Sequence, residues 1–143
     1  MIAIGSDHGG FALKQEIMEY LKGAGYEFCD VGCYEPKSVD YPDIAKLLCS
    51  KITSGDCELG ILVCGTGIGM SICANKIKGI RAAQCSDTFS ARMTRCHNNS
   101  NVLTMGGRTV GPELAKDIVK EFLTAEFEGG RHQTRIDKIM ELE

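Results

Sequence analysis

The segment LGILVCGTGIGMSICANK, from Leu59 to Lys76, decides the predicted fold. Its first residues are apolar and bounded by glycine, which indicates a short, fully buried strand. The strand ends at Cys64, the glycine-rich turn Gly65–Gly69 follows, and residues 70–76 are predicted to form a helix. In open α/β sheets, ligands bind at the carboxyl ends of the strands, and backbone N–H groups before a helix can point at an anion. The segment therefore predicts an anion site with a thiol at its edge.

Three well-known phosphate-binding motifs are similar to this turn, and each lacks a required residue here. A dinucleotide-binding fingerprint needs a third glycine where Met70 stands, and a P-loop needs Gly-Lys-Ser/Thr. A phosphatase loop of the Cys-x5-Arg type would need arginine at the position of Met70. The turn is therefore predicted to bind a smaller anion, or negative charge that develops during a reaction.

The composition is that of a single soluble globular domain. The chain has 143 residues, of which 43% are hydrophobic and 24% are charged, and this length suffices for a substantial core. A formal net charge of −3 gives no electrostatic footprint for nucleic acid or an anionic membrane. No apolar run approaches the roughly 18 residues of a spanning helix. Because the first predicted strand begins at once, without a basic leader, we expect a cytoplasmic protein.

Eight cysteines raise the question of disulfides or a zinc site. No two of them form a Cys-x-x-Cys pair, and a protein that is not exported keeps its thiols reduced. Cys29, Cys73 and Cys85 lie within apolar patterns, where cysteine behaves as a small hydrophobic residue. We therefore predict that most cysteines only pack. Cys64 is the exception, because its place before a glycine-opened helix favours the thiolate form.

Strands and helices are predicted to alternate along the whole chain. Strands are expected over residues 2–6, 26–31, 59–63, 80–85 and 101–106, and helices over 11–24, 43–54, 70–76, 87–96, 112–124 and 134–141. Connections of this length predict a parallel sheet that is covered on both faces. The predicted fold is α/β: a single three-layer α/β/α domain over residues 1–143, with a five-stranded parallel Rossmann-like sheet and an extra C-terminal helix.

The strand order would determine where the site lies. If the second strand lies beside the first and the third returns on the other side, the first and third strands flank a topological switch point. The loops at that point are residues 7–10 and 64–67, and both carry chemically capable residues followed by glycines. We therefore predict that Asp7 and His8 contact the ligand.

Further basic residues are candidates outside these loops. Arg131 and Arg135 are four residues apart, which places both guanidinium groups on one helix face as a phosphate clamp or as a solvated patch. His97 is predicted in a turn, residues 97–100, where it caps the preceding helix or transfers protons in a site on a neighbouring chain. Four lysines without convergent neighbours are predicted to lie on solvated faces: Lys14, Lys46, Lys116 and Lys120.

Taken together, the motifs resemble those of the type B ribose-5-phosphate isomerases. In chain order they are Ser6–Gly10, Asp40–Asp43, Cys64–Ile72, Ala74–Lys76, His97–Asn98 and Gly129–Arg135. The resemblance runs over essentially the whole chain. The same superfamily contains allose-6-phosphate and galactose-6-phosphate isomerases, so the resemblance implies the reaction more closely than the sugar.

The resemblance implies an aldose–ketose isomerisation that uses no metal and no cofactor. The sugar ring opens, and a proton then moves between C1 and C2 through an enediolate. Cys64 would be the base, because the glutamate that serves some members is replaced here by Met70, and Thr66 and His97 would assist ring opening. The sugar hydroxyls would be held by Asp7, Tyr41 and Asn98. The enediolate would be held by backbone N–H groups of Gly65, Gly67, Gly69 and Met70, and the phosphate by His8, Arg108, Arg131 and Arg135.

The resemblance also implies a homodimer with shared active sites, in which His97 and Asn98 face a neighbour's glycine turn. Pairing of dimers into tetramers stays open. The leading hypothesis is interconversion of ribose 5-phosphate and ribulose 5-phosphate in the pentose phosphate pathway, with an allose-6-phosphate or galactose-6-phosphate isomerase as the alternative. More distant alternatives are half of a heteromeric enzyme that needs a partner and a non-catalytic sugar-phosphate-binding protein, although the latter would not need Cys64, Thr66 and His97 together.

Overall fold

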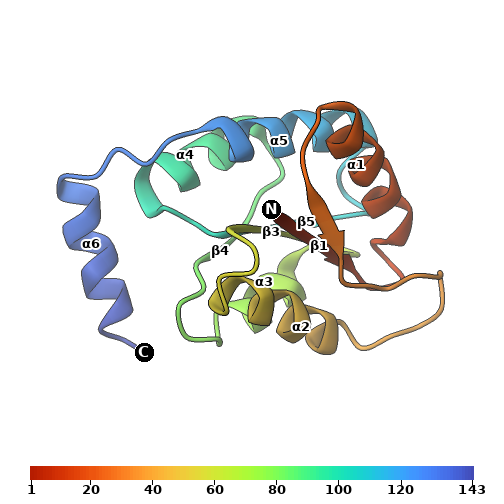
Figure 1. Ribbon diagram of the computed structural model, residues 1–143, viewed down its shortest axis with the longest axis horizontal. Coiled ribbons are helices and arrows are strands. Elements are labelled where there is room, and N and C mark those ends of the chain that lie inside the picture. The colour runs from red at the N-terminus through yellow and green to blue at the C-terminus, as the bar shows by residue number, and fades with distance from the viewer.

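A five-stranded parallel sheet runs through the middle of the computed structural model, which describes residues 1–143, and separates two layers of helices (Figure 1). The strands are β1 (Ile2–Ser6), β2 (Phe28–Asp30), β3 (Leu59–Cys64), β4 (Ala82–Gln84) and β5 (Val102–Gly106). The helices are α1 (Phe11–Gly23), α2 (Tyr41–Thr53), α3 (Ile68–Ala74), α4 (Thr88–Asn98), α5 (Pro112–Thr124) and α6 (Arg131–Met140). None of these helices combines the length and the hydrophobicity that crossing a membrane requires.

The strand order confirms the predicted switch point. The order is β2-β1-β3-β5-β4, and every neighbouring pair is parallel. β1 therefore has β2 on one side and β3 on the other. Ser6 at the end of β1 pairs with Val63, and Cys64 at the end of β3 pairs with Gly106. The loops that follow β1, β3 and β5 consequently leave the sheet side by side.

Successive residues of the central strands face the two helical layers in turn. Ile4 and Ile61 lie in the hydrophobic cluster beneath α1, α4 and α5, whereas Ala3 and Leu62 lie in the cluster against α2 and α3 (Figure 1). All four side chains are fully buried. A parallel strand covered on both faces needs apolar residues at every position. This requirement explains the unbroken apolar run in β3.

Two helix ends differ from the prediction in ways that matter for the site. His97 and Asn98 form the last turn of α4 instead of lying in a loop. The helix continues to Asn98 because Asn99 adopts the left-handed conformation (φ 44°) that ends it, and asparagine tolerates this conformation better than most residues. α6 begins at Arg131, three residues early, after two glycines at positive φ. The other predicted boundaries differ from the observed ones by at most two residues.

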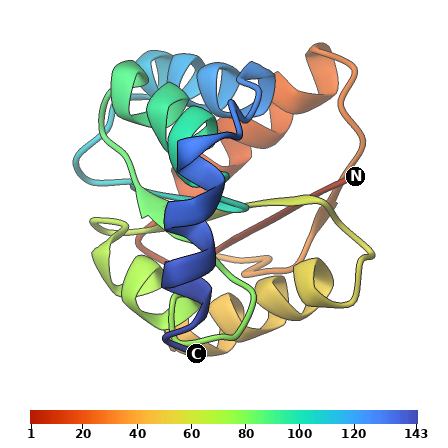
Figure 2. The ribbon, with the colours of Figure 1, turned by 90° about the vertical axis from the view of Figure 1, so that its left-hand side faces the viewer.

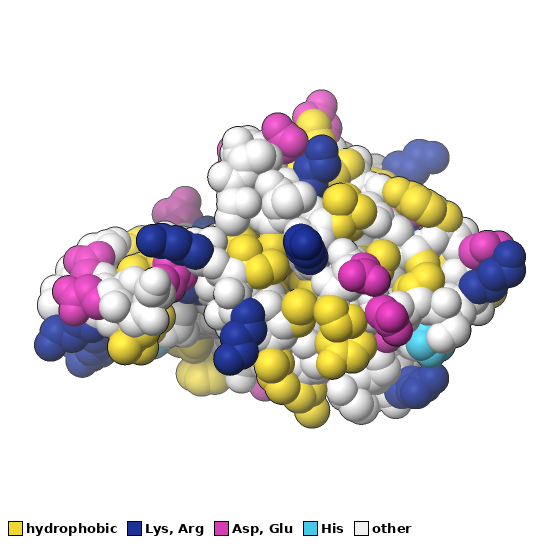
Figure 3. Space-filling view, turned by 90° about the horizontal axis from the view of Figure 1, so that it is seen from below, with side chains coloured by type: hydrophobic (Ala, Val, Ile, Leu, Met, Phe, Trp, Pro, Cys, Tyr) yellow, Lys and Arg dark blue, Asp and Glu magenta, His cyan; other side chains and the backbone are white.

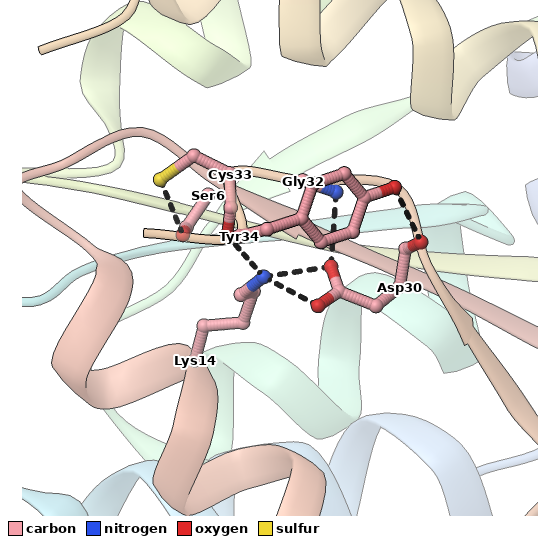
Figure 4. Close-up of polar contacts among 6 residues, drawn as sticks. All are labelled: Ser6, Lys14, Asp30, Gly32, Cys33 and Tyr34. Atoms are coloured by element: carbon pink, nitrogen blue, oxygen red, sulfur yellow. Dashed lines mark hydrogen bonds and ion pairs between the residues drawn. The ribbon is translucent and has the colours of Figure 1, made fainter. Parts of the chain in front are cut away.

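Lys14 is buried, which corrects the prediction that it lies on a solvated face. Its side chain has an exposure of 0%, and its Nζ donates hydrogen bonds to both carboxylate oxygens of Asp30 and to the carbonyl oxygen of Cys33, each at 2.7 Å (Figure 4). The ion pair ties α1 to the end of β2. Local periodicity does not reveal it, because Asp30 lies 16 residues further along the chain.

The C-terminal helix α6 stands apart from the three layers. Figures 1 and 2 show α6 at the β4 edge of the sheet, running from one helical layer toward the other. Two contacts tie its C-terminal end to the body: Arg81 Nη1 lies 3.5 Å from the Met140 sulfur, and the N–H of Gly79 donates to the Glu143 carboxylate at 2.8 Å. A cavity of about 480 Å³ lies between α6 and β4. The extra C-terminal helix is thus confirmed as an addition to the α/β/α domain.

Candidate active site

Three loops meet at the carboxyl ends of β1, β3 and β5. A Cβ added at Gly9, after β1, would lie 3.1 Å from the backbone nitrogen of Gly65, after β3. A Cβ added at Gly107, after β5, would lie 2.7 Å from the carbonyl oxygen of Gly9. Gly107 also donates its N–H to the carbonyl oxygen of Cys64 at 2.7 Å. Glycine is needed at these positions because the loops approach backbone to backbone.

The thiol of Cys64 differs from the other buried thiols in its surroundings. Cys64 ends β3 with 5% exposure, and its sulfur accepts a hydrogen bond from the N–H of Gly67 at 3.1 Å. Burial raises the pKa of the Cys49 thiol to about 12 and that of the Cys85 thiol to about 11, so very little of either is deprotonated near neutral pH. All eight cysteines are free. The N–H of Gly67 thus points at the Cys64 sulfur, at the edge of the loop cluster.

The turn from Cys64 to Met70, called the cradle below, presents backbone donors without acceptors. No other group of the chain accepts a hydrogen bond from the N–H groups of Gly65, Thr66, Gly69 and Met70. The N–H groups of Gly65, Gly69 and Met70 were expected to face the ligand, and that of Thr66 is an additional free donor. The N–H of Gly67, which was also expected to do so, is engaged by Cys64. Such preorganised donors can stabilise an oxyanion.

Two glycines fix the shape of the cradle. Gly67 has a φ of +79°, in the left-handed region that favours glycine, and a Cβ there would lie 2.7 Å from the backbone of Met105. Thr104 Oγ1 donates to the carbonyl oxygen of Gly67 at 2.9 Å. A Cβ at Gly69 would lie 2.8 Å from the ring of Tyr41, which places this tyrosine, at the start of α2, against the cradle.

Polar side chains from the other two loops border the cradle. Asp7 is 7% exposed, and its Oδ1 accepts the N–H of Gly10 at 3.0 Å, which orders the loop after β1. His8 in the same loop is exposed. Arg108 follows β5 and is exposed, with its Nη1 3.4 Å from the place where a Cβ on Gly65 would lie. The structure therefore brings Asp7 and Arg108 to the cradle, and His8 lies exposed in the same loop as Asp7.

The remaining candidates lie with α4 and α6, at the β4 edge of the sheet (Figures 1 and 2). His97 stacks on His132 of α6, with ring centroids 4.2 Å apart. Asn98 accepts a hydrogen bond at its carbonyl oxygen from Arg81 Nε at 3.0 Å. Arg131 and Arg135 are exposed on α6, and no carboxylate lies within ion-pair distance of either. The single chain does not bring these four residues into the loop cluster.

The loop after β5 was the part of the site that the residue patterns did not indicate. Arg108 was named only through the family resemblance, although Gly106 and Gly107 before it gave a usable signal. Two glycines at the end of a buried parallel strand mark a close approach of backbones at the ligand-binding edge. Because Cys64 pairs with Gly106, these two glycines lie beside the cradle.

Comparisons with known proteins agree with this geometry. The family model described as Ribose/Galactose Isomerase matches residues 2–139. The chain is 49% identical to the ribose-5-phosphate isomerase B of Escherichia coli strain K12, over 99% of this chain and 95% of that protein. It is also 49% identical to the D-erythrulose-4-phosphate isomerase of Pectobacterium atrosepticum, over 96% of this chain and 91% of that protein.

A solved structure matches the fold in detail. The ribose-5-phosphate isomerase B of Clostridium thermocellum superposes with a TM-score of 0.97 at 54% sequence identity, over 99% of this chain and 95% of that one. The predicted fold class is confirmed by this match. The shared architecture, the glycine-bordered cradle and the family match lead to one conclusion: this chain is an enzyme of the ribose/galactose isomerase family and groups with its type B ribose-5-phosphate isomerases.

Proposed function

We propose that this chain interconverts ribose 5-phosphate and ribulose 5-phosphate through an enediolate, with Cys64 as the base. The observation that carries the proposal is the composition of the cradle. A thiol and four N–H groups without acceptors, those of Gly65, Thr66, Gly69 and Met70, belong to one turn. A base beside preorganised donors is what proton transfer next to a carbonyl group requires.

Each step of the reaction uses one part of this arrangement. When the Cys64 thiolate removes the proton from C2, negative charge develops on the oxygen at C1. The cradle N–H groups stabilise that charge, and donors of this kind contribute about 2.7–4 kcal/mol each. The thiol then returns the proton to C1, while the proton of the C2 hydroxyl passes to the oxygen at C1, so the ketose forms without a covalent adduct. Thr66 and His97 assist ring opening, and the sugar hydroxyls are held by Asp7, Tyr41 and Asn98.

The substrate phosphate would be held by four basic side chains. Arg108 borders the cradle, His8 is exposed in the loop after β1, and Arg131 and Arg135 project from α6 without carboxylate partners. Forked guanidinium donors suit phosphate oxygens, and binding energy from this remote group orients the reacting carbons. The placement of α6 away from the loop cluster supports the view that the two arginines serve the cradle of another copy of the chain.

A homodimer would complete both sites. α3, which follows the cradle, exposes Ile68 by 54% and Ile72 by 60%. Figure 3 shows hydrophobic side chains gathered on the face over α2 and α3, with the more highly charged α6 to one side. A second copy that covers this face would bury the exposed isoleucines. It would also bring its own His97 and Asn98 to the cradle.

Complementation between inactive chains tests the shared site. A Cys64→Ala chain and a His97→Ala chain should each be inactive alone. Random pairing makes half of the dimers mixed, and each mixed dimer has one intact site of two, so about a quarter of the wild-type activity should return. Two affinity tags allow the mixed dimers to be isolated and assayed. Isolated mixed dimers without activity would contradict a site shared in this way.

The two arginines of α6 should act on phosphate binding. Arg131→Ala and Arg135→Ala should each weaken inhibition by inorganic phosphate, because a hydrogen bond to a charged group contributes about 1.5–3 kcal/mol. This range corresponds to roughly 10- to 150-fold in the inhibition constant. Lys138→Ala removes an exposed positive charge from the same helix and is the matched control. Equal phosphate affinity in all three variants would show that the two arginines form a solvated surface patch and do not bind phosphate.

Alternative functions differ in the substrate. Family resemblance leaves allose 6-phosphate and galactose 6-phosphate open, and the Pectobacterium relative is named for a four-carbon sugar. The deciding experiment assays the purified chain alone on four-, five- and six-carbon sugar phosphates and compares kcat/KM. The highest value on ribose 5-phosphate would support the proposal. A preference for another sugar would correct the substrate, and binding without turnover would indicate a non-catalytic sugar-phosphate-binding protein.

A further inference from the structure

Three metal-ligating side chains converge where α6 meets the end of α4. His97 comes from the last turn of α4, Glu128 from the segment after α5, and His132 from the first turn of α6. The Glu128 carboxylate oxygen lies 3.8 Å from His97 Nε2 and 3.5 Å from His132 Nε2. One ligand atom from each residue lies within 4.8 Å of the other two. Residues far apart in the sequence thus form one cluster.

One member of the cluster is fixed by packing, and the other two are exposed to solvent. The His132 side chain is only 8% exposed and stacks against the His97 ring at an interplanar angle of 9°. Glu128 is fixed through its backbone, because its N–H donates to the carbonyl oxygen of Cys96 at 3.0 Å. The side chains of His97 and Glu128 are 39% and 54% exposed. One buried imidazole is therefore fixed, while the other two ligands can adjust.

None of the three side chains makes a hydrogen bond within the chain, and both ion-pair distances exceed the usual hydrogen-bond length. The ring nitrogens of His132 are not among the buried polar atoms that lack a partner, so the ligand atoms of the cluster remain accessible to an ion from solvent. Two imidazole nitrogens and a carboxylate oxygen form a ligand set that suits zinc and leaves a fourth position open. Tetrahedral zinc needs its ligand atoms about 3.3 Å apart, as follows from metal–ligand distances near 2.0–2.1 Å. An ion lies in the plane of each imidazole that binds it, so the His97 ring must rotate out of its parallel stack on His132. The exposure of the His97 and Glu128 side chains leaves room for that rotation.

We propose that His97, Glu128 and His132 bind one divalent transition-metal ion, Zn²⁺ being the best match, and that this ion inhibits the enzyme. Binding the ion occupies Nε2 of His97. That imidazole can then no longer exchange a proton with the sugar-ring oxygen, so ring opening should stop. The inhibition rests on the proposed function, in which His97 assists ring opening, whereas the binding itself does not.

Thiols are the competing zinc ligands in this chain. Cys29 and Cys57 have their sulfur atoms 3.6 Å apart, away from the cluster on the other side of the sheet core. Co²⁺ is a suitable probe, because thiolate ligation produces a strong charge-transfer band in the near ultraviolet and a nitrogen–oxygen set does not. The titration therefore uses a chain that carries Cys29→Ser and Cys57→Ser and in which the three cluster residues are unchanged.

The test adds Co²⁺ to that chain and then measures Zn²⁺ affinity by competition with a chromogenic chelator. We expect one ion per chain, without a thiolate band. His132→Asn and Glu128→Gln should each weaken binding by at least about tenfold, since each removes a ligand. Glu126→Gln, a change at an exposed carboxylate two residues before Glu128, is the matched control and should leave binding unchanged. Equal affinity in all three variants, or a thiolate band, would overturn the site.

Activity is measured separately on the same proteins. Zn²⁺ should inhibit the chain with the midpoint that the binding titration gives, and Glu128→Gln should shift that midpoint upward by at least about tenfold. Binding at the cluster without loss of activity would overturn the inhibitory role. A chain that binds Co²⁺ through these ligands but isomerises no sugar phosphate would refute the proposed function and leave the metal site standing.

Discussion

Replacing Cys64 with serine should lower the isomerisation rate by about 10²- to 10⁴-fold, the usual contribution of a positioned base. Serine keeps an acceptor for the N–H of Gly67, so the cradle should keep its shape. The hydroxyl is a far weaker acid than the thiol, and it therefore cannot supply an anionic base near neutral pH. The loss should appear in kcat, while inhibition by inorganic phosphate should stay unchanged.

Incorporation of deuterium from D₂O into the sugar phosphate tests whether Cys64 is the base. Wild-type protein in D₂O should incorporate deuterium into the sugar phosphate, and Cys64→Ser should do so only at the reduced rate. Cys73→Ser changes a free, partly exposed thiol on α3 and should exchange at the wild-type rate, as a matched control. Near-normal exchange by Cys64→Ser would contradict the assignment and would move the search for the base to His97 or Asp7.

Replacing Lys14 with methionine should destabilise the fold by about 3–5 kcal/mol, because removal of one partner leaves a poorly solvated charge. Asp30 would keep only the N–H of Gly32, at 2.9 Å, as a partner for its carboxylate, whose side chain is 18% exposed. The carbonyl oxygen of Cys33 would lose its donor as well. Urea unfolding at one fixed protein concentration measures the change, since association also affects apparent stability.

Two further variants separate the buried ion pair from other effects of the substitution. Adding Asp30→Asn to Lys14→Met removes the stranded charge and keeps an acceptor for Gly32, so part of the lost stability should return. Lys46→Met removes an exposed lysine from α2 and should change stability by less than about 0.5 kcal/mol. Similar small effects for Lys14→Met and Lys46→Met would show that the ion pair does not stabilise the fold.

The alternation of strands and helices and the place of the cradle in the chain could be predicted from the sequence, because both depend on local information, whereas the strand order could only be assumed. An apolar run without alternation can only be a strand covered on both faces, and its length excludes a helix. Gly65 and Gly67 directly after Cys64 mark the ligand-binding edge, whatever the rest of the chain does. The loop after β1 carries the same pattern, and the observed pairing of Ser6 with Val63 brings the two together.

Only the tertiary structure decided which polar residues meet. Lys14 looks like any surface lysine until Asp30, on another element, reaches it inside the protein. Glu128 is likewise an ordinary surface residue in the sequence, and the turn into α6 places His132 against both Glu128 and His97. The physical reason is the range of the interaction. Hydrophobic periodicity repeats within one element and can be counted along the chain, whereas an ion pair or a ligand cluster depends on the distance between elements, which only their packing fixes.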